Sequence, residues 1–201
     1  MLDLKVATLT VVNKADHIGR DEPMLWTMFI VLSLDTINSR QFVVRTDPVA
    51  GKLGKVGKGD QAPVPAAVGH FQSSAAGIGM IGVATIAFDN DLRTNQQIRD
   101  GYAAGATALN QAIIDHFPQH GLAPVEAAEQ AEIQAKIREA VKKAFLADSV
   151  FLTLFGGKPL GGDSFTRVLT ENSISQNFSL TLRAKHDWAV YRVDGHLQFQ
   201  R

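Results

Sequence analysis

Acidic side chains gather in two separate loop segments of this sequence. Asp16, Asp21 and Glu22 lie in a polar stretch between two apolar runs, and Asp89 and Asp91 follow a third apolar run. Calcium takes about six to eight oxygen ligands, and carboxylates on neighbouring loops commonly supply them. We therefore predict that, if the protein binds a metal, these carboxylates are the ligands and calcium is the ion. The alternative interpretation is that they are ordinary turn residues and helix caps.

The surroundings of both loops carry a family resemblance. The stretch Gly19-Arg20-Asp21-Glu22-Pro23 resembles the Gly-x-Ser-Asp-Pro-Tyr segment of C2 domains, with an arginine in place of the serine and Met24 in place of the tyrosine. The segment 89–91, Asp-Asn-Asp, is similar to their Asp-x-Asp loop. This resemblance implies a calcium-binding β-sandwich. The stretch 21–27, Asp-Glu-Pro-Met-Leu-Trp-Thr, also resembles the opening of an uncharacterised group of bacterial proteins, which implies no activity.

Other residues with chemical potential fit the known motifs less well. The segment 51–59 alternates glycine and lysine, but no Gly-Lys pair in it is followed by Ser or Thr, so it is not a P-loop and we expect an exposed, flexible loop. His116 and His120 have the spacing of a helical zinc pair, but we expect Pro118 to break the helix between them. Ser73-Ser74 lacks the Gly-x-Ser-x-Gly elbow of hydrolases.

Two kinds of periodicity predict the elements that position these residues. β-Branched and alternating apolar residues indicate strands, and the clearest case is Phe178, Leu180 and Leu182 alternating with polar residues. The strands are expected at 4–12, 24–34, 41–45, 78–88, 178–183 and 188–199, with a short edge strand within 64–71 and irregular chain across the rest of 47–77. We expect Asn38-Ser39 to be a hairpin turn, while Asp194-Gly195 is either a hairpin turn or a bulge.

Helical spacing is confined to one region. Ile98, Leu109 and Ile113 fall on one face of a helix predicted over 96–117, and Ile137 and Val141 fall on one face of a second over 126–146. Acidic residues at the start of the second helix and basic residues in its later turns complement the helix dipole. The two helices are therefore expected to form a hairpin packed on the sheet.

The order of strands, then two helices, then strands predicts an α+β fold. It would be mainly an antiparallel β-sandwich or sheet with an inserted two-helix hairpin. We expect a single domain over 1–201, with a β framework at 1–90 and 160–201 and the helical hairpin at 93–150.

Composition excludes several classes of function. The 201 residues are 45% hydrophobic, so the chain can bury a core, and 20 basic residues balance 20 acidic ones, so no net positive charge favours nucleic acid. The absence of cysteine excludes disulfides, thiolate metal sites and cysteine nucleophiles. No signal peptide or membrane-spanning run is evident, so we expect a soluble, cytoplasmic protein.

Three functions remain compatible with the sequence. The first is a non-enzymatic binding module, calcium-dependent if the acidic loops bind the ion, that engages a membrane surface, a carbohydrate or a protein through its loop ends. The second is a toxin-like or effector-like protein whose helical hairpin rearranges at a membrane. The third is a hydrolase whose site forms only in the fold.

Overall fold

The computed structural model of the protein describes residues 1–13, 22–74, 77–89, 94–121, 127–146, 159–183 and 189–201. Its strands are β1 Leu2–Asn13, β2 Pro23–Leu32, β3 Val43–Arg45, β4 Gln61–Pro63, β5 His70–Ser73, β6 Met80–Asp89, β7 Pro159–Val168, β8 Ser173–Arg183 and β9 Val190–Gln200. Its helices are α1 Leu34–Ser39, α2 Ala66–Gly69, α3 Asn95–His120 and α4 Ala127–Leu146, with a 3-10 turn at Val49–Gly51. The α+β prediction is confirmed.

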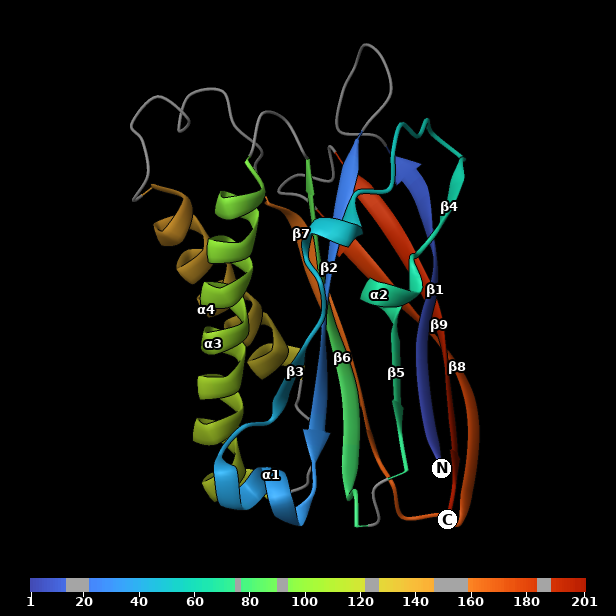
Figure 1. The fold of residues 1–201 in the computed structure, drawn as a ribbon, viewed down its shortest axis with the longest axis vertical. Coiled ribbons are helices and arrows are strands. Elements are labelled where there is room, and N and C mark those ends of the chain that lie inside the picture. Colours follow the sequence, from blue (N-terminus) through green and yellow to red (C-terminus); the bar gives the residue numbers. More distant parts are fainter. Residues whose placement is uncertain (14–21, 75–76, 90–93, 122–126, 147–158, 184–188) are drawn as a thin grey trace.

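Two antiparallel sheets and a helical layer are stacked in three layers (Figure 1). The outer sheet has the order β4-β1-β9-β8, with β5 also paired to β1, and the middle sheet has the order β3-β2-β6-β7. The α3–α4 hairpin covers the face of the middle sheet that points away from the outer sheet. The middle sheet is therefore covered on both sides, and every residue of β2 is buried.

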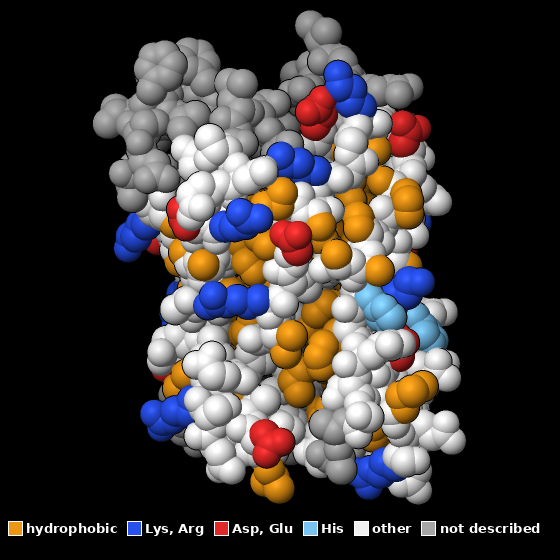
Figure 2. All heavy atoms as spheres, in the orientation of Figure 1, with side chains coloured by type: hydrophobic (Ala, Val, Ile, Leu, Met, Phe, Trp, Pro, Cys, Tyr) orange, Lys and Arg blue, Asp and Glu red, His pale blue; other side chains and the backbone are white. Residues whose placement is uncertain are grey.

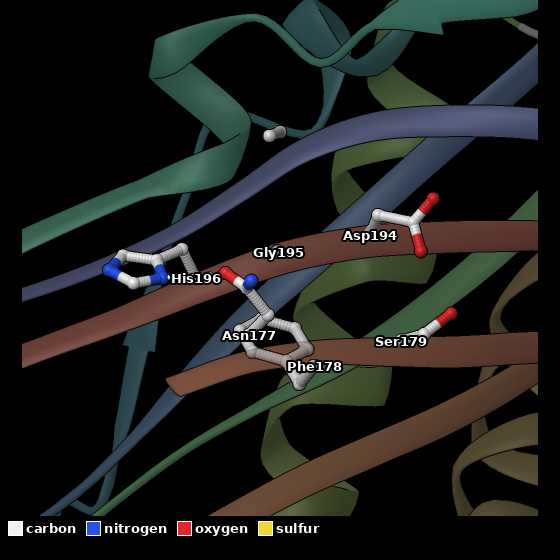
Figure 3. Close-up of a pocket in the computed structure, with 7 residues that line it drawn as sticks. Asn177, Phe178, Ser179, Asp194, Gly195 and His196 are labelled. Carbon is white, nitrogen blue, oxygen red and sulfur yellow. Dashed lines mark hydrogen bonds between the residues drawn. The ribbon is translucent and has the colours of Figure 1, made fainter. Parts of the chain in front are cut away.

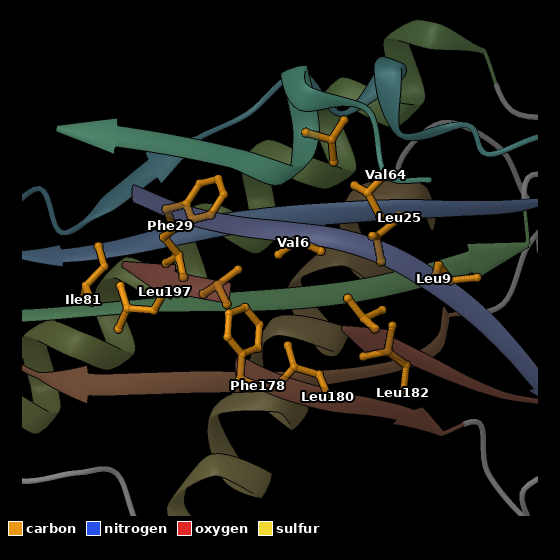
Figure 4. Packing of buried hydrophobic residues seen from close by; sticks show 14 of the residues in the cluster. Val6, Leu9, Leu25, Phe29, Val64, Ile81, Phe178, Leu180, Leu182 and Leu197 are labelled. Carbon is orange, nitrogen blue, oxygen red and sulfur yellow. The ribbon is translucent and has the colours of Figure 1, made fainter. Parts of the chain in front are cut away.

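The first core lies between the two sheets (Figure 4). Alternate residues of β2 and β6, such as Leu25, Phe29 and Ile81, face inward-pointing residues of the outer sheet. On β8 the buried residues are Ile174, Phe178, Leu180 and Leu182, and Ser179 and Arg183 are exposed. The predicted alternation in this strand is confirmed.

The second core lies between the middle sheet and the helices. Trp26 is at its centre, with ring centroids 4.2 Å from Phe88 and 5.6 Å from Tyr102 of α3. The predicted packing residues of the two helices, Ile98, Leu109, Ile113, Ile137 and Val141, are all buried in this cluster. Gly105 of α3 lets the helices approach closely, because a Cβ there would stand 3.0 Å from Val141 Cγ2. The helical-hairpin prediction is confirmed.

The connection between β2 and β3 differs from the expected turn at Asn38-Ser39. The two strands do pair, but the short helix α1 joins them. Its N-cap is Ser33, whose side chain accepts a hydrogen bond from Thr36 N while the Thr36 side chain accepts one from Ser33 N. This capping box fixes the N-terminal end of α1, and the left-handed conformation of Arg40 (φ 55°) ends the helix at its C-terminus.

Two further local predictions are corrected. The stretch 47–77, expected to hold at most one short strand, contains β4, α2 and β5, because it lies along β1 and fills its free edge. The predicted break at Pro118 is wrong, since α3 continues to His120 and ends at Gly121. Proline removes only one helical hydrogen-bond donor, and in the last turn of a long helix that loss is tolerated.

Asp194-Gly195 is not a hairpin turn, and the irregularity in the pairing lies in the opposite strand, β1. Strand β9 runs straight through both residues, and the register shift lies opposite them, between Val6 and Thr8. A Cβ on Gly195 would stand 2.2 Å from Phe178 Cζ and 2.5 Å from Lys5 O. Glycine is therefore required there because the Phe178 ring packs across the β9 backbone.

Candidate functional site

The sheet residues that adjoin the two acidic segments lie side by side at one end of the middle sheet. β2 begins and β6 ends there, and the antiparallel register pairs Pro23 with Asp89. Glu22 immediately precedes this pair, so the two loops leave the sheet from adjacent positions. Had β2 and β6 been parallel neighbours, the loops would have left at opposite ends.

Of the predicted metal ligands, only the side chain of Glu22 belongs to the described part of the chain. Asp16, Asp21 and Asp91 lie outside the described residues, and Asp89 is placed only as a backbone position in the β6 ladder. The Glu22 carboxylate is 44% exposed and lies 3.5 Å from Lys55 Nζ. Within the described residues, no group of three or more histidine and acidic side chains is arranged to hold a metal.

The glycine- and lysine-rich segment 51–60 lies beside the start of β2 and the end of β1. Leu53 N donates to Pro23 O at 3.0 Å, and Gly59 N donates to Val11 O at 2.8 Å, so the segment is fastened to the ends of β2 and β1. Gly51 is buried against β2, and a side chain does not fit there because a Cβ would stand 2.0 Å from Leu25 O. The segment is therefore attached to the sandwich at these two points, while Lys52, Lys55 and Lys58 are exposed, as expected.

Lysine side chains from this segment reach both neighbouring elements. Lys55 pairs with Glu22, and Lys52 Nζ donates to Asn95 Oδ1 at the start of α3 at 3.3 Å. A lysine ammonium group next to carboxylates reduces the repulsion between those carboxylates. Within the described residues, this end of the molecule thus carries the Glu22 carboxylate together with the ammonium groups of Lys52 and Lys55.

The start of α3 tests whether acidic residues of the second loop cap this helix. The N-cap of α3 is Thr94, whose side chain accepts from Gln97 N while Gln97 Oε1 accepts from Thr94 N. The cap of this helix is a threonine, so capping gives no reason for the acidic residues of 89–91.

His116, one of the two histidines considered for zinc, contacts the neighbouring helix. His116 is nearly buried on α3, and its Nδ1 lies in hydrogen-bonding contact with Glu129 Oε1 of α4. This contact ties the two helices together near their connection. His116 therefore has a structural role in the hairpin that the i, i+4 spacing with His120 did not predict.

A shallow depression of about 520 Å³ lies on the exposed face of the outer sheet (Figure 3). Cross-strand pairs from β8 and β9 form its polar border: Asn177 opposite His196, and Ser179 opposite Asp194. No local pattern in the sequence predicts this depression, because the alternation of β8 indicates that Ser179 faces outward but not which residues of β9 lie beside it.

The chemistry of this depression is that of a polar surface and not of a catalytic triad. His196 Nδ1 is 2.8 Å from Asn177 Oδ1, and the imidazole points away from Ser179 in Figure 3. Asp194 Oδ2 accepts from Arg192 Nε at 3.0 Å instead of orienting the histidine. Among the described residues Ser179 has no base in reach, and a serine without such a base is not activated as a nucleophile.

Charges of both signs are scattered over the face of the molecule shown in Figure 2, in keeping with the balanced composition. None of the helices described is both long enough and apolar enough to cross a membrane. In the comparisons with known proteins, the sequence matches no protein-family model. No curated protein is significantly similar to it.

Proposed function

We propose that the protein is a non-enzymatic, calcium-dependent binding module that uses the acidic end of its sandwich. Calcium would be held by carboxylates of Asp16, Asp21, Glu22, Asp89 and Asp91, and the loaded end would engage a partner that presents anionic oxygens, such as a phospholipid surface. The observation that carries the proposal is the pairing of Pro23 with Asp89, which starts both acidic loops from neighbouring positions.

Electrostatics gives a reason for a cation at this end. Carboxylates brought close together repel one another, and a divalent ion converts that repulsion into attraction. Lys55 already offsets the charge of Glu22. Calcium would then leave Lys52 and Lys55 able to contact an anionic partner, because the acidic groups would be neutralised by the ion.

Calorimetry and thermal melting with calcium test the proposal. A ligand that binds only the native state stabilises it by roughly 2.7 kcal/mol at a concentration 100-fold above its Kd, so calcium should raise the melting temperature. Magnesium should raise it less, because the smaller ion demands stricter octahedral geometry. The double variant Asp89→Asn/Asp91→Asn should lose the calcium effect.

The matched control is Asp35→Asn, which removes an exposed acid in the first turn of α1, at the opposite end of β2. It should keep the full response to calcium. Sedimentation with phosphatidylserine vesicles, in calcium and in chelator, then tests the partner. An unchanged melting temperature of the wild type in millimolar calcium would contradict the proposed function.

A further inference from the structure

Within the part of the chain that the structure describes, one edge of the outer sheet has backbone hydrogen-bonding groups without a partner. β8 is the last strand of that sheet (Figure 1), and its 11 residues pair with β9 without a register shift. Thr181 N donates to Asp163 Oδ2 and so points away from β9. Because backbone groups alternate along a strand, those of Ser173, Ser175, Asn177 and Ser179 point to the same free side.

The other strands at sheet edges have features that discourage pairing with another chain. β3 and β4 have three residues each and β5 has four. β7 begins at Pro159, has a register irregularity near its start, and contains Asp163 and Arg167. Short edges, proline, bulges and charges are the usual protection of a sheet edge.

β8 has none of these protections over most of its length. It contains no proline, and its single charged residue, Arg183, is the last of the strand. Ser173, Ser175, Asn177 and Ser179 are exposed, and among the described residues no backbone hydrogen bond reaches their free side from another segment. An edge of this kind is a template for one more antiparallel strand.

We propose that β8 pairs with β8 of a second copy of this chain, antiparallel and about a two-fold axis at Gln176. Asp163 closes the edge at Thr181, so the segment left for pairing is Ser173 to Ser179, whose centre is Gln176. A two-fold arrangement satisfies the same unpaired groups on both copies at once.

The side chains of this segment are complementary to themselves in that register. On the exposed face, Ser175 lies opposite Asn177 of the second copy, so neutral polar side chains meet. On the inner face, Ile174 lies opposite Phe178 of the second copy, so apolar side chains meet. The balanced net charge of the chain adds no repulsion between copies.

Light scattering or sedimentation equilibrium over a range of concentrations tests the pairing. The wild type should approach twice the mass of one chain. Ser175→Pro should weaken dimerisation at least roughly ten-fold, because proline removes an edge donor from each copy. The N–H of Ser175 does not serve β9, so the melting temperature of the monomer should change little.

Two further variants separate a lost interface from a misfolded chain. Ser175→Ala keeps the backbone donor and should remain dimeric. Ser175→Lys/Asn177→Lys places like charges opposite one another and should be monomeric, whereas Ser175→Asp/Asn177→Lys places opposite charges there and should be dimeric. A wild type that stays monomeric at all concentrations, or a dimer that survives both the proline and the double-lysine changes, would overturn the proposal.

Discussion

Tyr102 shows how a single polar atom joins three parts of the molecule. Its hydroxyl donates to Thr27 O of β2 at 2.9 Å and accepts from Thr46 N at 2.7 Å. Replacement by phenylalanine keeps the ring in the helical core but leaves Thr46 N without this acceptor. We expect Tyr102→Phe to lower the free energy of unfolding by about 1–3 kcal/mol, measured by chemical denaturation.

The same residue predicts a pH dependence. Burial raises the pKa of Tyr102 above its usual 10.0, and the hydrogen bonds with Thr46 only partly oppose this shift. The folded state therefore holds the phenolic proton more tightly than the unfolded state, so this stabilisation is complete below about pH 10 and is lost as the pH rises further. The free energy of unfolding, measured as a function of pH, should therefore no longer show this loss of stability above about pH 10 in Tyr102→Phe. Thr107→Ala, an exposed change on the same helix, should still show it.

At the level of elements, β8 offers a direct test of which face is buried. Leu180 and Thr181 are neighbours on opposite faces of the strand, one buried and one partly exposed. Leu180→Ala should cost about 2–5 kcal/mol by opening a cavity between the sheets, whereas Thr181→Ala should change stability by less than about 0.5 kcal/mol. The bond from Thr181 N to Asp163 survives the second change because it uses the backbone. If urea denaturation showed equal losses of unfolding free energy in the two variants, the assignment of Leu180 to the buried face would be wrong.

The elements that were predicted correctly are those with a strong local period. The alternation in β8 and the helical spacing of Ile98, Leu109 and Ile113 follow from one face being buried, so the sequence reveals them without knowledge of the partner. α1 was missed because its six residues are too few to show a period, although Ser33 and Thr36 carry a capping signal. β4 and β5 are strands only because β1 lies beside them.

At the scale of the whole molecule, Asp163 links the two sheets. It lies on β7 of the middle sheet, and its carboxylate accepts from Ser164 N and from Thr181 N of the outer sheet, each at 2.8 Å. Thr27 and Thr85 occupy the same row of the middle sheet, so a polar row crosses an otherwise apolar core. The bond from Thr181 N to Asp163 favours one placement of the two sheets, because a shift would break it and leave buried polar groups without a partner.

Asp163→Ala should therefore destabilise the protein by about 1–3 kcal/mol and speed hydrogen exchange at the Thr181 amide. Asp163→Asn retains an acceptor oxygen and should lose less. The matched control is Asp194→Ala on the exposed face of β9, where the ion pair with Arg192 is partly solvated and should contribute little. Unchanged exchange at Thr181 in Asp163→Ala would show that this contact does not hold the sheets together.

By itself the sequence determined the α+β class, the helical hairpin, the buried faces of its main strands and the acidic character of two loops, because each depends on residues close together in the chain. The tertiary structure alone decided that Pro23 lies beside Asp89, that Asn177 lies beside His196, and that Asp163 reaches Thr181. Those pairings join residues 18 or more positions apart in the chain. They depend on which strands become neighbours and in what register, and that choice is made by the packing of the whole core, which no local pattern of residues encodes.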